Sequence, residues 1–378
     1  MVIRFRTLLA AFAIVPLALL AGCTRSASSG PGPGKSHRPT RVAVAIPGRP
    51  SPAAVSLSET GSTLLYPLLR SWSAAYHREF PNVSISTNAT GSGTGIADAS
   101  SGTADIGASD AFLSSGDLVQ NPSMLNIPLA ISAQQVNYDL PKLPPSVHLK
   151  LTGAVLAAMY QGRIRTWNDP AIAALNPGIT LPALRVVPLH RVESSGDTFL
   201  FSSYLSTGDA HWNSAIGYGT TVAWPHVPGA RAELANSGMI SGCVKTPGCV
   251  AYIGISYLSQ ATRAGLGEAA LRNAAGRFEL PTGPTMSAAV SSFVAAIPAN
   301  ETISMVSGPA ANGYPIVNYE YAIVTRRQPS AVKARDVKAF LQWAITAGSS
   351  ARFLNPVRFV PLPAPVVSLA DAQIARIR

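Results

Sequence analysis

The sequence lacks the motifs on which hydrolytic and metal-dependent enzymes usually depend. It has no Gly-x-Ser-x-Gly nucleophile elbow, no His-Glu-x-x-His motif and no dense cluster of carboxylates and histidines. Its histidines show no metal-ligand spacing, and its three cysteines would need further ligands beside them to hold a metal. We therefore expect no catalytic residues, no metal and no cofactor, and we interpret the chain as a protein that is not an enzyme.

Acidic residues are scarce as well, with 18 Asp and Glu against 29 Lys and Arg, for a formal net charge of +11. Seven of the bases precede the first acid, Glu59, and removing these seven from the 29 leaves 22 bases against the 18 acids. The excess positive charge therefore belongs largely to the N-terminal segment, where it can lie against anionic lipid head groups. No stripe of basic and aromatic residues follows, so we expect no nucleic acid as a partner.

Long apolar runs are scarce too. The N-terminal segment contains an apolar stretch, but this stretch is short. A basic start precedes the apolar segment from Leu8 to Ala21, which is too short for a comfortable transmembrane helix. The next residues, Leu20-Ala21-Gly22-Cys23, resemble the lipobox of bacterial lipoproteins, in which the cysteine carries acyl chains such as palmitate. We expect a signal peptide at 1–22, then lipidated Cys23 and a flexible tether rich in Ser, Gly and Pro at 23–52. The alternative is an ordinary secretory signal with an incidental cysteine.

The other two cysteines, Cys243 and Cys249, flank a short segment that contains Pro247-Gly248. An exported protein sits where disulfides persist, and a Pro-Gly turn can bring the two Cα atoms into bridging range. We predict a small local disulfide. A metal site is the alternative, and no further His or Cys stands beside the pair to complete it.

Short apolar or β-branched runs alternate with helical periods from Ser56 onward, which predicts an α/β fold. A chain of 378 residues also exceeds one compact core, so we expect two domains of ordinary size. We expect strands at 55–57, 83–87, 105–108, 127–137, 186–191 and 316–324, and helices from near 62–64, over 94–101, after Asp169-Pro170, from Ser195 and over 337–345.

Three segments share one design, a strand followed by a turn of small polar residues and then a helix. They are Thr60-Gly61-Ser62-Thr63-Leu64, Thr90-Gly91-Ser92-Gly93-Thr94-Gly95, and Arg191-Val192-Glu193-Ser194-Ser195-Gly196-Asp197-Thr198. Helix N-termini leave backbone N–H groups unpaired and carry a partial positive charge, which suits an anion. One such turn is ordinary capping chemistry, but three of them with an arginine beside the third indicate an anion site.

The strings ETGSTLLYPL, GSGTGIADASSGTADIGASDA, TWNDPAIAALNPG and HRVESSGDTFLF resemble the PstS family, the phosphate-binding components of phosphate-specific ABC importers. The agreement is closest to the mycobacterial phosphate-binding lipoproteins, and it continues through GCVKTPGCVAYIGIS and NYEYAIV to QWAIT. The likeness covers nearly the whole chain after the tether, with the motifs in order.

The resemblance implies a set of phosphate-binding residues. Asp110 matches the carboxylate that accepts a hydrogen bond from the ligand, and Arg191 matches the bidentate cation. Glu193 stands where a carboxylate orients that arginine, although Asp is usual there, so the geometry of the pair is left open. The remaining positions match donors at the three helix starts, with Asp197 standing where many members have Thr: Thr63, Leu64, Ser92, Ser195, Gly196 and Asp197.

A carboxylate among the ligands would make the site selective, because phosphate at neutral pH carries a proton and sulfate carries none. Asp110 can only accept a hydrogen bond, so it rewards a ligand that donates one and repels a fully ionised oxyanion. Phosphate is therefore expected over sulfate or molybdate.

The resemblance also implies the architecture and the cellular role. We expect a two-lobed α/β fold like that of type II periplasmic binding proteins, each lobe a mostly parallel sheet flanked by helices, with two hinge crossings. Lobe I would comprise 53–130 and 314–378, and lobe II 131–313. The chain would be a lipid-anchored monomer on the extracytoplasmic face of the cell membrane that binds inorganic phosphate and delivers it to the permease subunits of an ABC importer. A phosphate-ester-processing enzyme and a surface adhesin on the same fold are the alternatives.

Overall fold

The computed structural model describes residues 48–378 of the chain. The predicted signal peptide, the lipidated Cys23 and the tether up to residue 47 lie outside the described residues. The first described residues run along lobe I, where the Ser51 N–H donates to Asp336 (2.6 Å) and the Gly48 N–H donates to Gln342 (3.0 Å). No helix among residues 48–378 is both long and apolar enough to cross a membrane.

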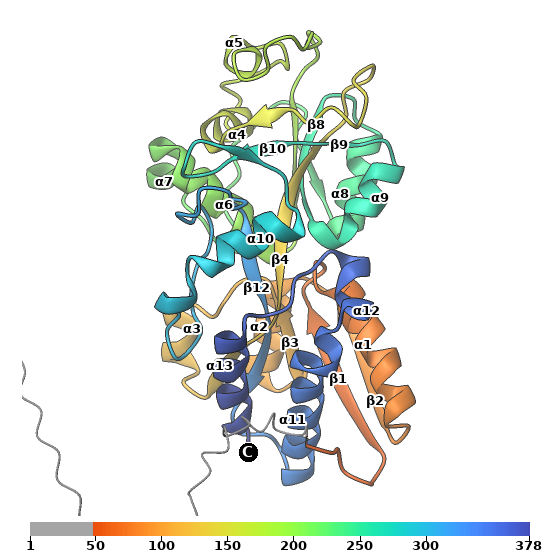
Figure 1. Cartoon of the computed structure of the whole chain (residues 1–378). Coiled ribbons are helices and arrows are strands. Elements are labelled where there is room, and N and C mark those ends of the chain that lie inside the picture. The colour runs from red at the N-terminus through yellow and green to blue at the C-terminus, as the bar shows by residue number, and fades with distance from the viewer. Residues whose placement is uncertain (1–47) are drawn as a thin grey trace, which may run out of the picture. The chain divides into compact units, whose positions relative to one another are not determined.

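The main sheet has nine strands, and eight of them follow one path (Figure 1). Along this path they are β2 (Val83–Ala89), β1 (Val55–Gly61), β3 (Ile106–Ser109), β12 (Val317–Thr325), β4 (Met124–Tyr138), β8 (Cys249–Gly254), β6 (Val187–Arg191) and β7 (Arg231–Glu233). The ninth strand, β9 (Gly267–Glu268), pairs with β4 beside β8. A second sheet contains β11 (Phe278–Glu279), β10 (Ala270–Arg272) and β5 (Lys150–Leu151).

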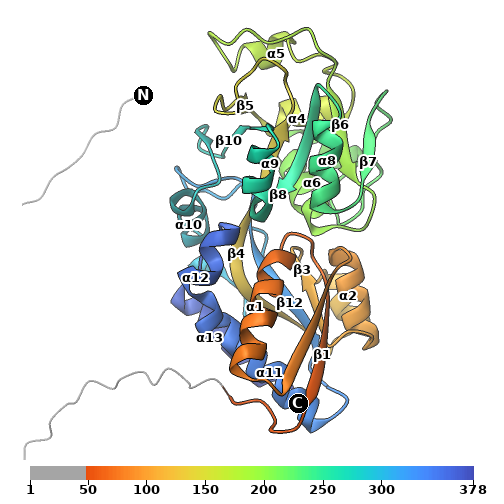
Figure 2. The same ribbon diagram turned by 90° about the vertical axis from the view of Figure 1, so that its right-hand side faces the viewer.

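Two of these strands, β4 and β12, run between two lobes and join them (Figure 2). Residues 124–133 of β4 pair antiparallel with β12, whereas residues 134–138 pair antiparallel with β8. The crossing strands also pair antiparallel with β3 (from β12) and with β9 (from β4). The remaining pairs of the main sheet are parallel: β1 with β2 and β3 in lobe I, and β6 with β7 and β8 in lobe II. All 15 residues of β4 are buried, which explains why its sequence is mostly apolar and does not alternate between apolar and polar residues.

The helices of lobe I cover its part of the sheet. Helix α1 buries Leu68, Leu69, Trp72 and Tyr76, which recur at the spacing of one helix face. It begins at Tyr66, slightly later than the sequence suggested, because the Ser62 hydroxyl and carbonyl cap a separate turn by accepting from Leu65 and Tyr66. The helices of this lobe are α1 (Tyr66–Glu79), α2 (Ser92–Ser101), α3 (Ser115–Gln120), α11 (Ala331–Ile345), α12 (Ala351–Leu354) and α13 (Ala364–Ala375).

The helices of lobe II surround β8 and β6. Asp169 caps the short helix after it, with Pro170 at the first helical position as predicted. The predicted disulfide is present: Cys243 at the end of α8 is bonded to Cys249 at the start of β8, with the Cα atoms 5.4 Å apart. The helices of this lobe are α4 (Gly153–Tyr160), α5 (Pro170–Ala173), α6 (Gly196–Gly208), α7 (Ala210–Ala215), α8 (Ala235–Val244), α9 (Leu258–Arg263) and α10 (Gly283–Ser291).

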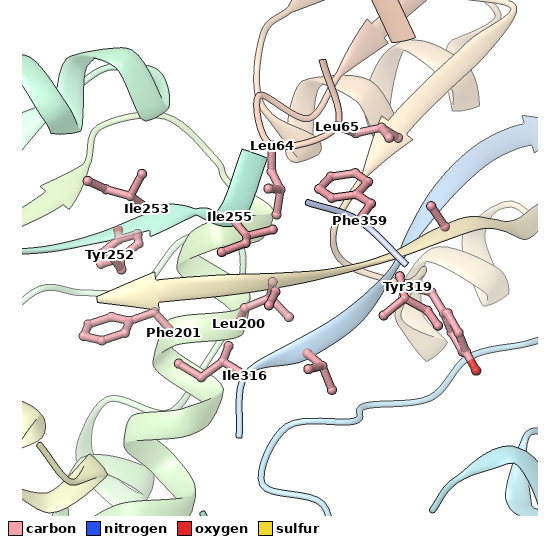
Figure 3. Packing of buried hydrophobic residues seen from close by; sticks show 14 of the residues in the cluster. Leu64, Leu65, Leu200, Phe201, Tyr252, Ile253, Ile255, Ile316, Tyr319 and Phe359 are labelled. Atoms are coloured by element: carbon pink, nitrogen blue, oxygen red, sulfur yellow. The ribbon is translucent and has the colours of Figure 1, made fainter. Parts of the chain in front are cut away.

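Apolar side chains from both lobes meet beside the crossing strands (Figure 3). Leu64 of lobe I is fully buried and lies next to Ile255 of lobe II. A Cβ atom built on Gly254 would stand 2.3 Å from Leu64 Cδ1, so the backbone and the leucine are in close contact. The Ser256 hydroxyl donates to the Leu64 carbonyl across the same boundary (2.7 Å). The two lobes are therefore in contact at the N-terminal turn of α1.

Candidate functional site

Lobe I places Thr63, Ser92 and Asp110 at one edge of its sheet. Each follows the carboxyl end of a strand, respectively β1, β2 and β3, and these three strands are parallel neighbours. In open α/β sheets this edge is where ligands bind. All three residues are buried. The sequence prediction that these residues share a region is therefore matched by the topology.

Lobe II contributes the end of β6 and the start of α6. Arg191 is the last residue of β6, and Ser195 is the N-cap of α6, with its hydroxyl accepting from the Asp197 N–H (3.1 Å). The Ser195 N–H donates to the Thr220 carbonyl (2.8 Å), so this residue keeps only its hydroxyl hydrogen for another partner. Ser195, predicted as a donor, can therefore serve a ligand through its hydroxyl and not through its backbone N–H.

The two sets of residues meet across the lobe boundary. Arg191 Nη2 donates to the Thr63 hydroxyl (3.1 Å), and the Gly93 N–H donates to the Ser194 carbonyl (3.1 Å). A Cβ atom built on Gly196 would stand 2.5 Å from Asp110 Oδ2 and 2.6 Å from the Ser92 hydroxyl oxygen. Asp110 and the third helix start therefore face each other in one shared region.

Several backbone donors converge on this region. Within residues 48–378, the N–H groups of Thr63, Leu64 and Gly196 have no hydrogen-bond partner. The first two belong to the turn before α1, and Gly196 is the first residue of α6. Unpaired N–H groups at helix starts form a natural anion site, and α6 adds the positive end of its dipole.

Arg191 is held by two carboxylates. Its Nη1 donates to Asp197 Oδ2 (2.5 Å), while Nε (2.8 Å) and Nη2 both donate to Glu193 Oε1. The guanidinium is fully buried. Burial lowers the pKa of Arg191, but Asp197 and Glu193 more than offset this and raise it above its ordinary value. The geometry that the sequence left open is thus a guanidinium fixed on two sides by Glu193 and Asp197.

The buried Asp110 carboxylate is closely surrounded by hydroxyl groups. Its Oδ1 accepts from the Ser62 hydroxyl, and its Oδ2 lies 3.3 Å from the Ser92 hydroxyl oxygen. Burial and then the negative charge of Asp197 raise the pKa of Asp110, against smaller opposing effects that include the hydrogen bond from Ser62 and the charge of Arg191. The side chain is an acceptor surrounded by donors, with one cation, Arg191, and two further acids, Asp197 and Glu320, nearby.

Three buried polar residues of the site carry no role in the sequence prediction. Asn236 at the start of α8 donates to both Thr63 Oγ1 and Asp197 Oδ2, each at 2.8 Å. Gln134 of β4 donates to Asp197 Oδ1 (3.0 Å), and Ser62 donates to Asp110. Ser62 stands inside a motif that the sequence analysis quoted. Asn236 and Gln134 lie in ordinary helix and strand sequence and give no comparable signal.

The site residues suit an oxyanion better than a metal. Among residues 48–378 no group of three His, Cys, Asp or Glu side chains could hold a metal ion. The carboxylates Glu193 and Asp197 are occupied by Arg191, and the remaining groups are mostly donors. Such a set can surround an anion and offers it one acceptor, Asp110.

A family model described as "PBP superfamily domain" matches residues 47–347. Among curated proteins, the phosphate-binding protein PstS of Xylella fastidiosa (strain 9a5c) is 32% identical over 361 residues, which cover 94% of this chain and 96% of that protein. PstS of Methanocaldococcus jannaschii is also 32% identical, over 94% and 91% of the two chains. A mycobacterial relative, PstS 3 of Mycobacterium leprae, is 29% identical over 92% of each chain.

Solved structures share the fold at lower identity. A high affinity periplasmic phosphate-binding protein solved with bound phosphate matches with a TM-score of 0.65 and 19% identity, over 84% of this chain and 93% of that one. An ABC-type phosphate transport receptor from Vibrio cholerae matches with a TM-score of 0.53 and 15% identity, over 81% and 100% of the two chains. At such identities the likeness shows the two-lobed α/β fold alone.

Proposed function

The chain belongs to the PstS phosphate-binding proteins within the PBP superfamily, and on that premise we propose that it binds inorganic phosphate and delivers it to an ABC importer. The observation that carries the proposal is the meeting of Arg191 and Asp110 in one buried region, each on a different lobe. The arginine supplies a fixed cation, and the aspartate supplies an acceptor for a protonated oxygen.

The proposed ligand contacts follow from the donors on each side. Lobe I contributes the N–H groups of Thr63 and Leu64, the hydroxyl of Ser92 and the carboxylate of Asp110. Lobe II contributes Arg191, the Ser195 hydroxyl, the Gly196 N–H and Asp197, with Glu193 orienting the arginine. This set is supported by the meeting of these groups at one boundary, where Asp197 is paired with Arg191 and does not face a ligand on its own.

Selectivity for phosphate would arise from Asp110. A carboxylate accepts a hydrogen bond from the hydroxyl of hydrogen phosphate, whereas sulfate presents only lone pairs to it. A buried acceptor that is left unpaired costs about 1–3 kcal/mol, and more when it is charged. Sites that demand a hydrogen-bond partner reach discrimination of about 10⁴. We therefore expect strong preference for phosphate over sulfate.

Ligand-driven closure of the lobes would couple binding to transport. We propose that the two lobes move as two bodies about β4 and β12. Lobe I comprises 53–130 and 314–378, and lobe II comprises 131–313. Both bodies supply donors, so only the closed arrangement completes the contacts, and the ligand shifts the population toward it. The closed form would be the one that the permease subunits recognise.

The cellular setting is part of the same proposal. The lipobox-like segment at Cys23 would follow a signal peptide and attach the chain through acyl groups to the extracytoplasmic face of the cell membrane, where it would act as a monomer. No catalytic role is proposed, because the buried groups here are engaged in holding Arg191 or are suited to binding alone.

Calorimetry on the purified full chain would test the binding proposal. Phosphate is expected to bind far more tightly than sulfate, and Asp110→Ala or Arg191→Ala should abolish the tight phosphate binding. Equal affinity for the two anions, or unaltered binding in both variants, would contradict the proposal. Release of product from a generic phosphate ester, blocked by Ser195→Ala, would favour an enzyme instead.

A further inference from the structure

Glu320 on β12 is a second buried carboxyl beside Asp110. The last register pair between β12 and β3 is Tyr321 with Ser109, so Glu320 stands one step farther along, opposite Asp110. The Asn318 amide bridges the two positions by donating to the Asp110 carbonyl (3.2 Å) and to Glu320 Oε1 (3.0 Å). A hydrogen bond between the two side chains lowers the pKa of Asp110 and raises the pKa of Glu320.

On the other side of β12, the ladder with β4 is irregular beside Glu320. The β4–β12 ladder has an irregularity between Glu320 and Tyr321, where Ala130 pairs with Glu320 and Pro128 with Tyr321, leaving Leu129 as the extra residue. Such a bulge changes the direction of neighbouring side chains and accommodates Pro128, which has no N–H for the ladder. Glu320 is 0% exposed, so it cannot reach solvent.

The hydrogen bonds of Glu320 distinguish its two oxygens. Oε1 accepts from Ser132 and from Asn318, as the carbonyl oxygen of a protonated carboxyl would. Oε2 is buried, and no donor among residues 48–378 forms a hydrogen bond to it. Two carboxylates in contact in a buried site cannot both ionise, so the pair holds a proton. Oε2 is the atom positioned to carry it.

The ionisable neighbours favour a proton on Glu320 rather than on Asp110. Burial and then Asp110 raise the pKa of Glu320 well above its ordinary value. Asp110 is also raised, by burial and Asp197, but Ser62 and Arg191 act to lower its pKa. On β12 itself the flanking titratable groups are Tyr319 and Tyr321, and the Tyr321 hydroxyl donates to the Glu301 carbonyl (3.1 Å). The ionised member of the pair is therefore Asp110, the one that faces the lobe boundary.

We propose that Glu320 is a positioning residue of the phosphate site: its protonated carboxyl donates to Asp110 and thereby keeps Asp110 an ionised acceptor for the ligand's hydroxyl. This inference rests on the proposed function. If the proton resided on Asp110 instead, that side chain could donate to a fully ionised oxyanion and the preference for phosphate would weaken. Glu320 would thus set selectivity without touching the ligand.

Binding measured against pH separates this role from a purely structural one. In the wild-type chain, phosphate affinity should fall as the pH rises far enough to ionise Glu320, because a second negative charge then faces the site, by up to about tenfold per pH unit. Glu320→Gln supplies a permanent N–H donor and never ionises, so this alkaline loss of affinity should disappear. Glu320→Leu removes the donor, and its preference for phosphate over sulfate should fall at least about tenfold.

Glu301→Gln is the matched control, because Glu301 is another fully buried carboxyl near β12 but contacts Tyr321 rather than the site. It should keep the wild-type pH profile of binding. Thermal unfolding of each variant checks that the fold is intact. If Glu320→Gln loses as much affinity at alkaline pH as the wild type does, the inference about Glu320 is wrong, while the proposed function is unaffected. Failure of the wild-type chain to bind phosphate at any pH would overturn the proposed function and this inference with it.

Discussion

Gly196 at the start of α6 approaches Asp110 so closely that a Cβ atom at residue 196 would stand 2.5 Å from the carboxylate Oδ2. The contact joins the two lobes, because Gly196 belongs to one and Asp110 to the other. A glycine is required here by space rather than by backbone conformation, since Gly196 is not among the glycines with positive φ.

Gly196→Ala should weaken phosphate binding by opposing closure of the lobes. Overpacking of this kind costs about 1–3 kcal/mol, which corresponds to an increase in Kd of roughly 5- to 150-fold. Titration calorimetry measures the change. Gly283→Ala is the control, because Gly283 is likewise the first residue of a lobe II helix, α10, and a Cβ there would meet nothing within 4 Å. Equal Kd values for both variants would show that the Gly196 contact does not limit binding.

Arg191→Lys should reduce phosphate affinity by at least about 100-fold. The guanidinium donates at once to Glu193, Asp197 and Thr63, and a single ammonium group cannot reproduce this planar set. The control is Arg231→Lys, which alters an arginine with the same i,i+2 relationship to an acid, Glu233, but with a 48% exposed side chain. Fluorescence or calorimetric titration would show the difference. If Arg191→Lys binds phosphate as tightly as the control does, the role assigned to the planar guanidinium of Arg191 is wrong.

Asp110→Asn should reduce selectivity more than it reduces stability. An asparagine amide can both accept and donate, so it no longer penalises an anion that has no hydrogen to offer. We expect the ratio of sulfate Kd to phosphate Kd to fall by at least about 100-fold, measured in competition with phosphate. A ratio that stays at the wild-type value would place the source of discrimination elsewhere.

Phosphate binding by the wild-type chain should weaken as the solution becomes acidic. Burial and Asp197 raise the pKa of Asp110 to about 7. Below that pH, Asp110 is protonated in the free protein, and it must lose this proton before it can accept a hydrogen bond from the ligand. The affinity should therefore fall by up to about tenfold per pH unit below about pH 7. Asp110→Asn should lack this dependence, and an identical acid slope in that variant would assign it to another group.

Stability should depend on pH through Glu301. Both of its carboxylate oxygens are buried without a hydrogen-bond partner among residues 48–378, and burial raises its pKa from 4.5 to about 8. Because the folded-state pKa is the higher one, the folded state binds the proton more tightly than the unfolded chain. The resulting stability is fully present below pH 4.5 and is lost as the pH rises toward about 8.

Glu301→Gln should remove that dependence. Above pH 8 the variant is expected to be more stable than the wild type, by on the order of 3 kcal/mol, and near pH 4 the two should converge. Denaturant unfolding across this range measures the difference. Glu279→Gln, which alters a partly exposed acid, serves as control. A variant that is less stable than the wild type at alkaline pH would contradict the assignment.

The sequence predicted the parts of the site that follow strands. Thr63, Ser92 and Asp110 could be placed together because each ends a parallel strand, and parallel neighbours bring their carboxyl ends to one edge. The disulfide was predictable because the two cysteines are six residues apart across a Pro-Gly turn. The crossing strands were recognisable because their segments are mostly apolar and extended.

The contacts between elements distant in the sequence could not be predicted in the same way. Asn236 reaches Thr63 over 173 residues, and its position in α8 carries no local signal. The pairing of Arg191 with both Glu193 and Asp197 required the relative orientation of β6 and α6. Glu320 stands in a strand whose sequence looks like ordinary core, and only the pairing register of β12 with β3 shows that it lies opposite Asp110.

The uninterrupted course of β4 has a consequence for how the lobes separate. The same strand bonds to β12 through residue 133 and to β8 from residue 134, with no loop between. The two lobes must therefore open by bending a continuous hydrogen-bonded strand and not by rotating about a flexible loop. Amide deuterium uptake along 130–138 should accordingly stay slow whether or not ligand is bound, while the turns at residues 61–65 and 192–196 exchange faster in the open form.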